Sequence, residues 1–175
     1  MTNENPQPLE IERKYLILMP SPERLSAEST RRIEITQTYL RSEAGISSRR
    51  VRRSRDRDGE RLYYTEKERL TDATRIERER EITPAEYAAL LAEADEERRP
   101  IEKTRWCVPW EGHTLEIDVF PFWDDRAFCE VELAAEDERV SLPGWIEVVR
   151  EVTADRRYTN LALAREIPRE DIAGT

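Results

Sequence analysis

Charged side chains that stand two residues apart are the feature of this sequence that can do chemistry. Acidic pairs occur four times and basic pairs twice at this spacing, with two single basic residues on further segments: Glu10/Glu12, Glu77/Glu79, Glu116/Asp118, Glu130/Glu132, Arg50/Arg52, Lys103/Arg105, Lys67 and Arg75. Because successive side chains of a β-strand point to opposite faces, both members of a pair lie on one face. Arginine and lysine bind phosphate oxygens, and carboxylates bind hard cations such as Mg²⁺ and Mn²⁺. A pocket that held both sets would suit a nucleotide or a polyphosphate together with a divalent metal.

The segments that carry these pairs alternate between charged and apolar residues, which is the pattern of a strand with one polar face. Eight strands are predicted, over residues 9–17, 33–40, 48–55, 61–69, 75–82, 101–108, 114–120 and 127–134. Asp58-Gly59 and Glu111-Gly112 favour turns between neighbouring strands. The opposite faces carry apolar residues such as Val51 and would pack against a core.

Helices are expected in three places between and after these strands. Residues 23–32 are predicted to form a short helix, and residues 142–167 contain further helix-forming stretches. Thr83, Pro84 and Glu86 have the residue types and spacing of a helix start with a capping box. With no linker or repeat to divide it, the chain of 175 residues is predicted to be a single domain over 1–175, with residues 1–8 as a flexible N-terminus.

Two architectures account for the alternation. In an open antiparallel sheet the charged faces would be exposed to solvent, and the pairs would be ordinary surface residues. In a closed barrel they would point inward and line a cavity for a small ligand. The favoured fold class is α+β and mainly antiparallel β, with an eight-stranded, closed, tunnel-like barrel, a charged lumen and a few outer helices.

Composition excludes several other classes of function. The net charge of −9 argues against a nucleic-acid coat, which needs a basic surface. No apolar run approaches the length of a membrane helix, and the N-terminus does not resemble a signal peptide, so a cytoplasmic location is expected. Cys107 and Cys129 are expected to be reduced, and the single histidine, His113, excludes a histidine-based zinc site. A small-molecule substrate and a monomer or homodimer are predicted.

The order of the charged motifs resembles the CYTH superfamily, the triphosphate tunnel metalloenzymes, over nearly the whole chain. The matching segments are Glu10-Ile11-Glu12-Arg13-Lys14 (ExExK), Arg50-Val51-Arg52 (RxR), Thr65-Glu66-Lys67 (TxK), Arg75-Ile76-Glu77-Arg78-Glu79 (RxExE), Lys103-Thr104-Arg105 (KxR), Glu116-Ile117-Asp118 (ExD), Glu130-Val131-Glu132 (ExE), and Glu151-Val152-Thr153 with Asp155, Tyr158 and Asn160. ExExK alone would be a weak signal, but this order of motifs is specific. The resemblance is to short bacterial-type members that consist of this domain alone.

The resemblance implies a tunnel that holds a linear triphosphate, most often inorganic tripolyphosphate, and hydrolyses it with Mg²⁺ or Mn²⁺. The implied substrate-binding residues are Lys14, Arg50, Arg52, Lys67, Arg75, Lys103 and Arg105. The implied metal ligands are Glu10, Glu12, Asp118, Glu130 and Glu132, and the implied catalytic residues are Lys14, Lys67, Glu12 and Glu132. Glu77, Glu79 and Glu116 would support the basic side chains.

Other functions remain open at the level of sequence. Within the same family, thiamine triphosphatase and class IV-type adenylyl cyclase are alternatives to inorganic triphosphatase. A protein that binds polyphosphate or a nucleotide without turnover is an alternative from a different class. A pure binding protein would not need the carboxylates Glu130 and Glu132, so their presence favours an enzyme.

Overall fold

Nine antiparallel strands form almost all of the regular structure in the part of the chain that the structure describes. The computed structural model describes residues 9–42 and 46–172, and the segment 1–8, predicted to be flexible, lies outside the described residues. The strands are β1 (Leu9–Leu18), β2 (Arg31–Tyr39), β3 (Ser48–Asp56), β4 (Gly59–Arg69), β5 (Thr74–Glu81), β6 (Ile101–Trp110), β7 (His113–Val119), β8 (Arg126–Glu132) and β9 (Val148–Glu151).

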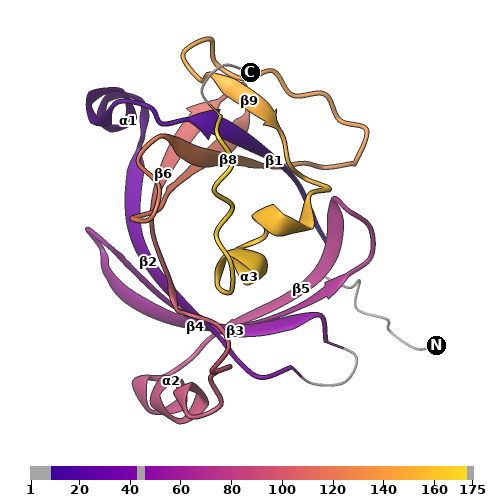
Figure 1. Ribbon diagram of the computed structural model, residues 1–175. Coiled ribbons are helices and arrows are strands. Elements are labelled where there is room, and N and C mark those ends of the chain that lie inside the picture. The colour runs from indigo at the N-terminus through magenta and orange to yellow at the C-terminus, as the bar shows by residue number, and fades with distance from the viewer. Residues whose placement is uncertain (1–8, 43–45, 173–175) are drawn as a thin grey trace, which may run out of the picture.

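The sheet closes into a barrel because β1 pairs with strands from both ends of the order. The strand order is β5-β4-β3-β2-β6-β7-β8-β1-β9, and residues Leu9 to Ile11 of β1 also pair with β5. The remainder of β1, from Glu12 to Leu18, pairs with β8. Eight strands therefore make the closed ring seen in Figure 1, which confirms the predicted barrel, and β9 is an additional strand.

The segment from residue 142 to residue 167 departs from the helical expectation. It contains β9, a short 3-10 helix η1 (Arg156–Tyr158) and the single-turn helix α3 (Asn160–Leu163). β9 forms because β5 pairs only with the first residues of β1, which leaves Tyr15 to Ile17 free to pair with a different strand. The local helix preference of this segment is overridden by that pairing.

The other helices begin where the sequence predicts. α2 (Pro84–Leu91) has the expected capping box between Thr83 and Glu86. α1 (Pro22–Glu28) is capped by Ser21 and is shorter than the predicted helix over residues 23–32, because Arg31 and Arg32 already pair with β6. None of the helices within residues 9–42 and 46–172 has the length and apolar character of a membrane span.

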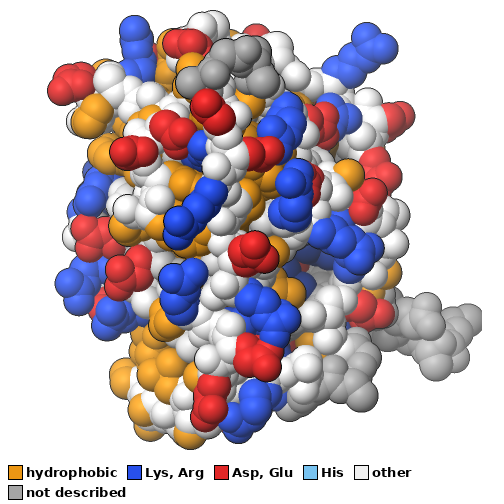
Figure 2. Space-filling model, viewed as in Figure 1, with side chains coloured by type: hydrophobic (Ala, Val, Ile, Leu, Met, Phe, Trp, Pro, Cys, Tyr) orange, Lys and Arg blue, Asp and Glu red, His pale blue; other side chains and the backbone are white. Residues whose placement is uncertain are grey.

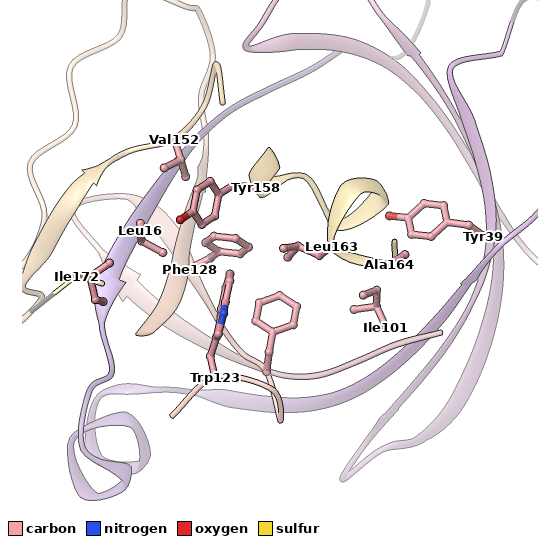
Figure 3. Close-up of a cluster of buried hydrophobic side chains, with 11 residues drawn as sticks. Leu16, Tyr39, Ile101, Trp123, Phe128, Val152, Tyr158, Leu163, Ala164 and Ile172 are labelled. Atoms are coloured by element: carbon pink, nitrogen blue, oxygen red, sulfur yellow. The ribbon is translucent and has the colours of Figure 1, made fainter. Parts of the chain in front are cut away.

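One end of the barrel is closed by a buried apolar cluster. Phe120, Trp123 and Phe128 stack edge to face, with ring centroids 5.3–5.6 Å apart, and Tyr158 packs on Phe128 at 5.9 Å. Leu163 extends from the α3 segment into this cluster (Figure 3). Viewed along the barrel, α3 lies inside the ring of strands (Figure 1). The cluster and α3 together form a plug at this end.

The apolar faces of the strands lie outside the lumen and are covered by helices and loops. One cluster, which includes Leu25 of α1, packs on β6, β7 and β8, and a second joins Val51, Leu62 and Ile82 with Tyr87 of α2. Figure 2 shows that the outer surface carries basic and acidic side chains interspersed with apolar ones. The outward strand faces are thus apolar where helices and loops cover them, whereas the lumen is lined by charged side chains.

Candidate functional site

The inward faces of the strands gather the predicted basic residues around one cavity. The cavity holds about 120 Å³ and lies within the barrel. All seven predicted substrate-binding residues line it: Lys14, Arg50, Arg52, Lys67, Arg75, Lys103 and Arg105. The register of the arginine-rich strand β3 decides this arrangement, because Arg50 and Arg52 face the cavity while Arg53 is exposed on the opposite face.

The predicted carboxylates divide between the cavity and its open mouth. Glu10, Glu12, Glu77, Glu116 and Glu130 line the cavity. A wider vestibule of about 600 Å³ is lined by all five of these carboxylates and adds Glu79 of β5 and Glu132, the last residue of β8. The plug closes one end, so this vestibule is the acidic entrance to a basic interior.

Ion pairs connect the two sets of charges. Lys14 lies 2.8 Å from Glu130, and Lys67 bridges Glu10 at 3.0 Å and Glu77 at 2.5 Å. Lys14 and Glu130 are directly opposite each other on β1 and β8.

Arg75 on β5 and Arg52 on β3 are paired in the same way. Arg75 lies 2.7 Å from Glu12. Arg52 donates to both oxygens of Glu79 at 3.0 Å, and Thr65 donates to the same carboxylate at 2.9 Å. The supporting role that the resemblance implies for Glu79 stays a prediction, and these contacts are consistent with it.

Arg105 joins most of the carboxylates on the β6–β7–β8 wall. Its guanidinium pairs with Glu116, Asp118 and Glu130, at 2.7 Å for Asp118 and 3.0 Å for Glu130. Lys103 takes the second oxygen of Asp118. Asp118 has no exposed surface and lines neither the cavity nor the vestibule. The structure therefore places Asp118 behind the basic side chains, and its role as a metal ligand stays a prediction.

Burial and charge act in opposite directions on the pKa values of this wall. Burial alone would raise the pKa of Glu130, but the cations Lys14, Lys103 and Arg105 hold it well below its usual value. Burial, reinforced by the neighbouring Arg105, lowers the pKa of Lys103 to about 8. A negative charge close to Lys103 would stabilise its protonated form against burial and the repulsion of Arg105, and a phosphate group would supply that charge.

Two buried guanidinium groups have hydrogen-bonding capacity to spare. The Nε atoms of Arg50 and Arg52 are buried and have no hydrogen-bond partner among the described residues. A buried donor on a charged group costs free energy when it is unpaired. An anionic ligand in the lumen would satisfy both donors, and this is the clearest structural sign of what the cavity binds.

Some lining residues have no counterpart among the predicted site residues. Gln37 and Tyr39 of β2 line the cavity, with Gln37 Nε2 donating to the Tyr39 hydroxyl at 3.2 Å. Asn160 and Leu161 of the plug line it from the closed end. Gln37 and Tyr39 share one face of their strand, but they are uncharged, so a search for charge pairs misses them.

The carboxylates at the mouth suit a hard divalent cation. Glu12 and Glu132 are directly opposite each other on β1 and β8, and the side chain of Glu132 forms no ion pair or hydrogen bond with the described residues. Two like charges in this position repel unless a cation lies between them. Within residues 9–42 and 46–172, no group of three or more histidine, cysteine or acidic side chains already has the geometry of a metal centre. The ligand set of Glu10, Glu12, Glu130 and Glu132 is chemically suitable and stays a prediction.

Comparisons with known proteins agree with this site. No family model matches the chain. It is 33% identical over 164 residues to an inorganic triphosphatase of Nitrosomonas europaea, covering 91% of this chain and 99% of that protein. It is 38% identical over 104 residues to an inorganic triphosphatase of Acetivibrio thermocellus, covering 59% of this chain and 65% of that protein's length. The solved structure of the inorganic triphosphatase NE1496 superposes with a TM-score of 0.57 at 29% identity, covering 91% of this chain and all of that one.

The lowered pKa of Lys103 predicts how stability changes with pH. The unfolded chain keeps this proton up to a pKa near 10.5, whereas the folded protein releases it near pH 8. Between these values the unfolded state binds more protons, so the contribution of Lys103 to the free energy of unfolding rises with pH. We expect the free energy of unfolding of the wild type, minus that of Lys103→Met, to increase by up to ~3 kcal/mol from pH 8 to 10.5. Urea denaturation across this range measures it, and a flat or falling difference contradicts the assignment.

Proposed function

Because the chain belongs to the CYTH superfamily of triphosphate tunnel metalloenzymes, we propose that it hydrolyses inorganic tripolyphosphate to pyrophosphate and phosphate with a divalent metal. The observation that carries this proposal is the buried, unsatisfied Nε of Arg50 and of Arg52 in a lumen lined by seven basic side chains. A linear polyanion is the ligand that such a lumen accommodates at the lowest electrostatic cost.

The basic residues bind and orient the phosphate chain. Arg50 and Arg52 on β3 face Lys103 and Arg105 on β6, with β2 between the two strands. Arginine binds two phosphate oxygens through its planar guanidinium, and lysine supplies a mobile point charge. Lys14 and Lys67 enter from β1 and β4 and would stabilise negative charge on the phosphate oxygens during the reaction.

The carboxylates at the mouth would hold the metal ion. Glu10, Glu12, Glu130 and Glu132 supply the oxygen ligands that Mg²⁺ and Mn²⁺ prefer. When bound, the ion neutralises charge on the phosphate oxygens and on the leaving pyrophosphate.

Hydrolysis also needs a water molecule aimed at the terminal phosphorus. Glu12 or Glu132 would orient this water or accept its proton, and their pairing across β1 and β8 in the lining of the vestibule supports this assignment. The water oxygen bonds to the terminal phosphorus while the bond to the bridging oxygen breaks and pyrophosphate leaves. The plug excludes solvent from the opposite end of the phosphate chain.

The first test is phosphate release. We expect the purified protein to release phosphate from tripolyphosphate in the presence of Mg²⁺ or Mn²⁺, and to lose this activity when EDTA is added. Colorimetric phosphate assays on tripolyphosphate, ATP and thiamine triphosphate, with products identified by chromatography, separate the family's alternative activities. Full activity in EDTA, or no release from any of the three substrates with metal, would falsify the proposal.

Mutation should separate substrate binding from catalysis. Arg52→Ala removes a phosphate contact that exists in both the ground state and the transition state, so we expect KM to rise about 10-fold with a smaller loss of kcat. Arg53→Ala is the matched control, because Arg53 is the next residue on the same strand and lies exposed on the outer face. Equal effects of the two substitutions on KM would show that Arg52 does not bind the substrate.

Glu132→Ala removes a predicted metal ligand at the mouth. We expect kcat to fall at least ~10²-fold, equivalent to ~2.7 kcal/mol of transition-state stabilisation, with part of the loss recovered at higher metal concentration. Glu102→Ala is the control, because Glu102 is an exposed carboxylate on β6 between two inward-facing residues. Normal turnover of Glu132→Ala at low Mg²⁺ would contradict the metal assignment.

A further inference from the structure

The only histidine of the chain lies at the mouth of the lumen. His113 is the first residue of β7, directly after the turn at Glu111-Gly112, where both residues have positive φ. Its side chain lines the vestibule together with Glu132. The sequence gives this residue no role, and neither the predicted metal ligands nor the predicted phosphate-binding residues include it.

His113 contacts β8 at the point where the pairing between β7 and β8 stops. The last paired residues of these strands are Leu115 and Val131, so Glu132 is the first residue of β8 without a partner on β7. On the other side, the chain is still held to β1, because Leu133 N–H donates to Ile11 O at 2.8 Å. The His113 imidazole lies against the unpaired edge, with Nδ1 3.3 Å from the carbonyl oxygen of Glu132. A carbonyl only accepts, so the Nδ1–H donates and substitutes for the missing backbone donor.

The orientation of the imidazole is itself fixed. His113 Nε2 lies 3.0 Å from Glu138 Oε1, and a carboxylate oxygen only accepts, so both contacts of the ring are hydrogen bonds together when both ring nitrogens carry a proton. The other oxygen of Glu138 accepts from Ala134 N–H at 2.7 Å. Glu138 therefore links the imidazole to the loop that follows β8. Through its contact with the Glu132 carbonyl, the imidazole also links this loop to the end of β8.

We infer that His113 is a positioning residue that holds Glu132 at the metal-binding mouth through its hydrogen bond to the Glu132 carbonyl. The inference rests on the proposed function, because it concerns the carboxylate assigned to the metal. Glu132 faces Glu12 across β1 and β8, and their mutual repulsion would push the end of β8 outward in the absence of a cation. A restraint on the Glu132 backbone keeps the two carboxylates close enough to share an ion. Groups that orient a metal ligand in this way contribute strongly to metal affinity.

Two isosteric substitutions separate the two contacts of the ring. In His113→Asn the amide nitrogen takes the place of Nδ1, which retains the donor to Glu132 and removes the contact with Glu138. In His113→Gln the amide nitrogen takes the place of Nε2, which retains the contact with Glu138 and removes the donor to Glu132. Both variants lose the ring, so each is the packing control for the other.

The readout is Mn²⁺ binding to the substrate-free protein, measured by electron paramagnetic resonance titration. We expect the Kd for Mn²⁺ to rise about 10-fold in His113→Gln and to stay within about 2-fold of the wild type in His113→Asn. Urea unfolding of both variants shows whether either loses stability. In hydrolysis assays, the Mg²⁺ concentration for half-maximal activity should rise in His113→Gln, whereas kcat at saturating Mg²⁺ should change little.

Equal Mn²⁺ affinities in the two variants, or a change confined to the unfolding midpoint, would show that His113 stabilises the loop after β8 without positioning Glu132 for metal binding. Glu132→Gln is the companion variant, and unchanged Mn²⁺ affinity in that protein would overturn the inference at its premise. Failure of the proposed function is a separate result. A wild-type protein that binds Mn²⁺ and shows the expected separation of the variants, but cleaves no triphosphate, supports the positioning role and refutes the hydrolase.

Discussion

The cost of placing seven basic side chains inside a closed barrel governs the rest of the structure. Lys14, Arg50 and Lys103 are each at most 8% exposed, so hydration by bulk solvent does little to stabilise their charges. A buried charge without a partner is too costly for a domain of this size to tolerate. Carboxylates on neighbouring strands therefore supply the compensation, as Glu130 does for Lys14 and Asp118 for Lys103.

The plug makes the two ends of the charged lumen different, because it closes only one of them. At the closed end, the aromatic cluster and α3 replace solvent with an apolar wall, and at the open end Glu79 and Glu132 add negative charge to the vestibule. A polyanion that enters alone would meet mostly like charges before it reached Lys14, Arg50 and Lys103, because the carboxylates that line the vestibule outnumber its arginines. A polyanion that carries divalent cations would not, because the cations suit the carboxylates at the mouth. The distribution of charge along the barrel thus favours entry of the phosphate chain with its metal.

The alternation of charged and apolar residues predicted which side chains share a face, because a strand has only two faces. Arg50 and Arg52 on β3 show this most clearly, since a shift of one residue would have turned Arg49 and Arg53 inward instead. The alternation fitted an open sheet as well as a closed barrel, and the order of the charged motifs, which resembles that of a family of barrels, favoured the barrel. Alternation says nothing about which charges meet across strands, so the burial of Asp118 behind Lys103 and Arg105 was not predictable. β9 was not predicted for a related reason. Its four residues, Val148–Glu151, show no alternation, and they form a strand only because one edge of β1 is available for pairing at Tyr15 to Ile17.

Ligand binding in this lumen exchanges interactions as well as adding them. The unpaired Nε atoms of Arg50 and Arg52 can take new acceptors, but Arg75 can turn to a phosphate only by loosening its contacts with Glu10 and Glu12. Each carboxylate released in this way is a partly buried negative charge that has lost its partner, and a divalent cation restores the balance. The same cation is bound more tightly once the competing arginine has moved to the phosphates. Under the proposed function, metal and triphosphate would therefore stabilise each other's binding through the shared ion pairs, and this coupling would be reciprocal by thermodynamic necessity. A lumen with cations alone would bind the polyanion but could not produce this coupling, which is why the carboxylates are as much a part of the site as the arginines.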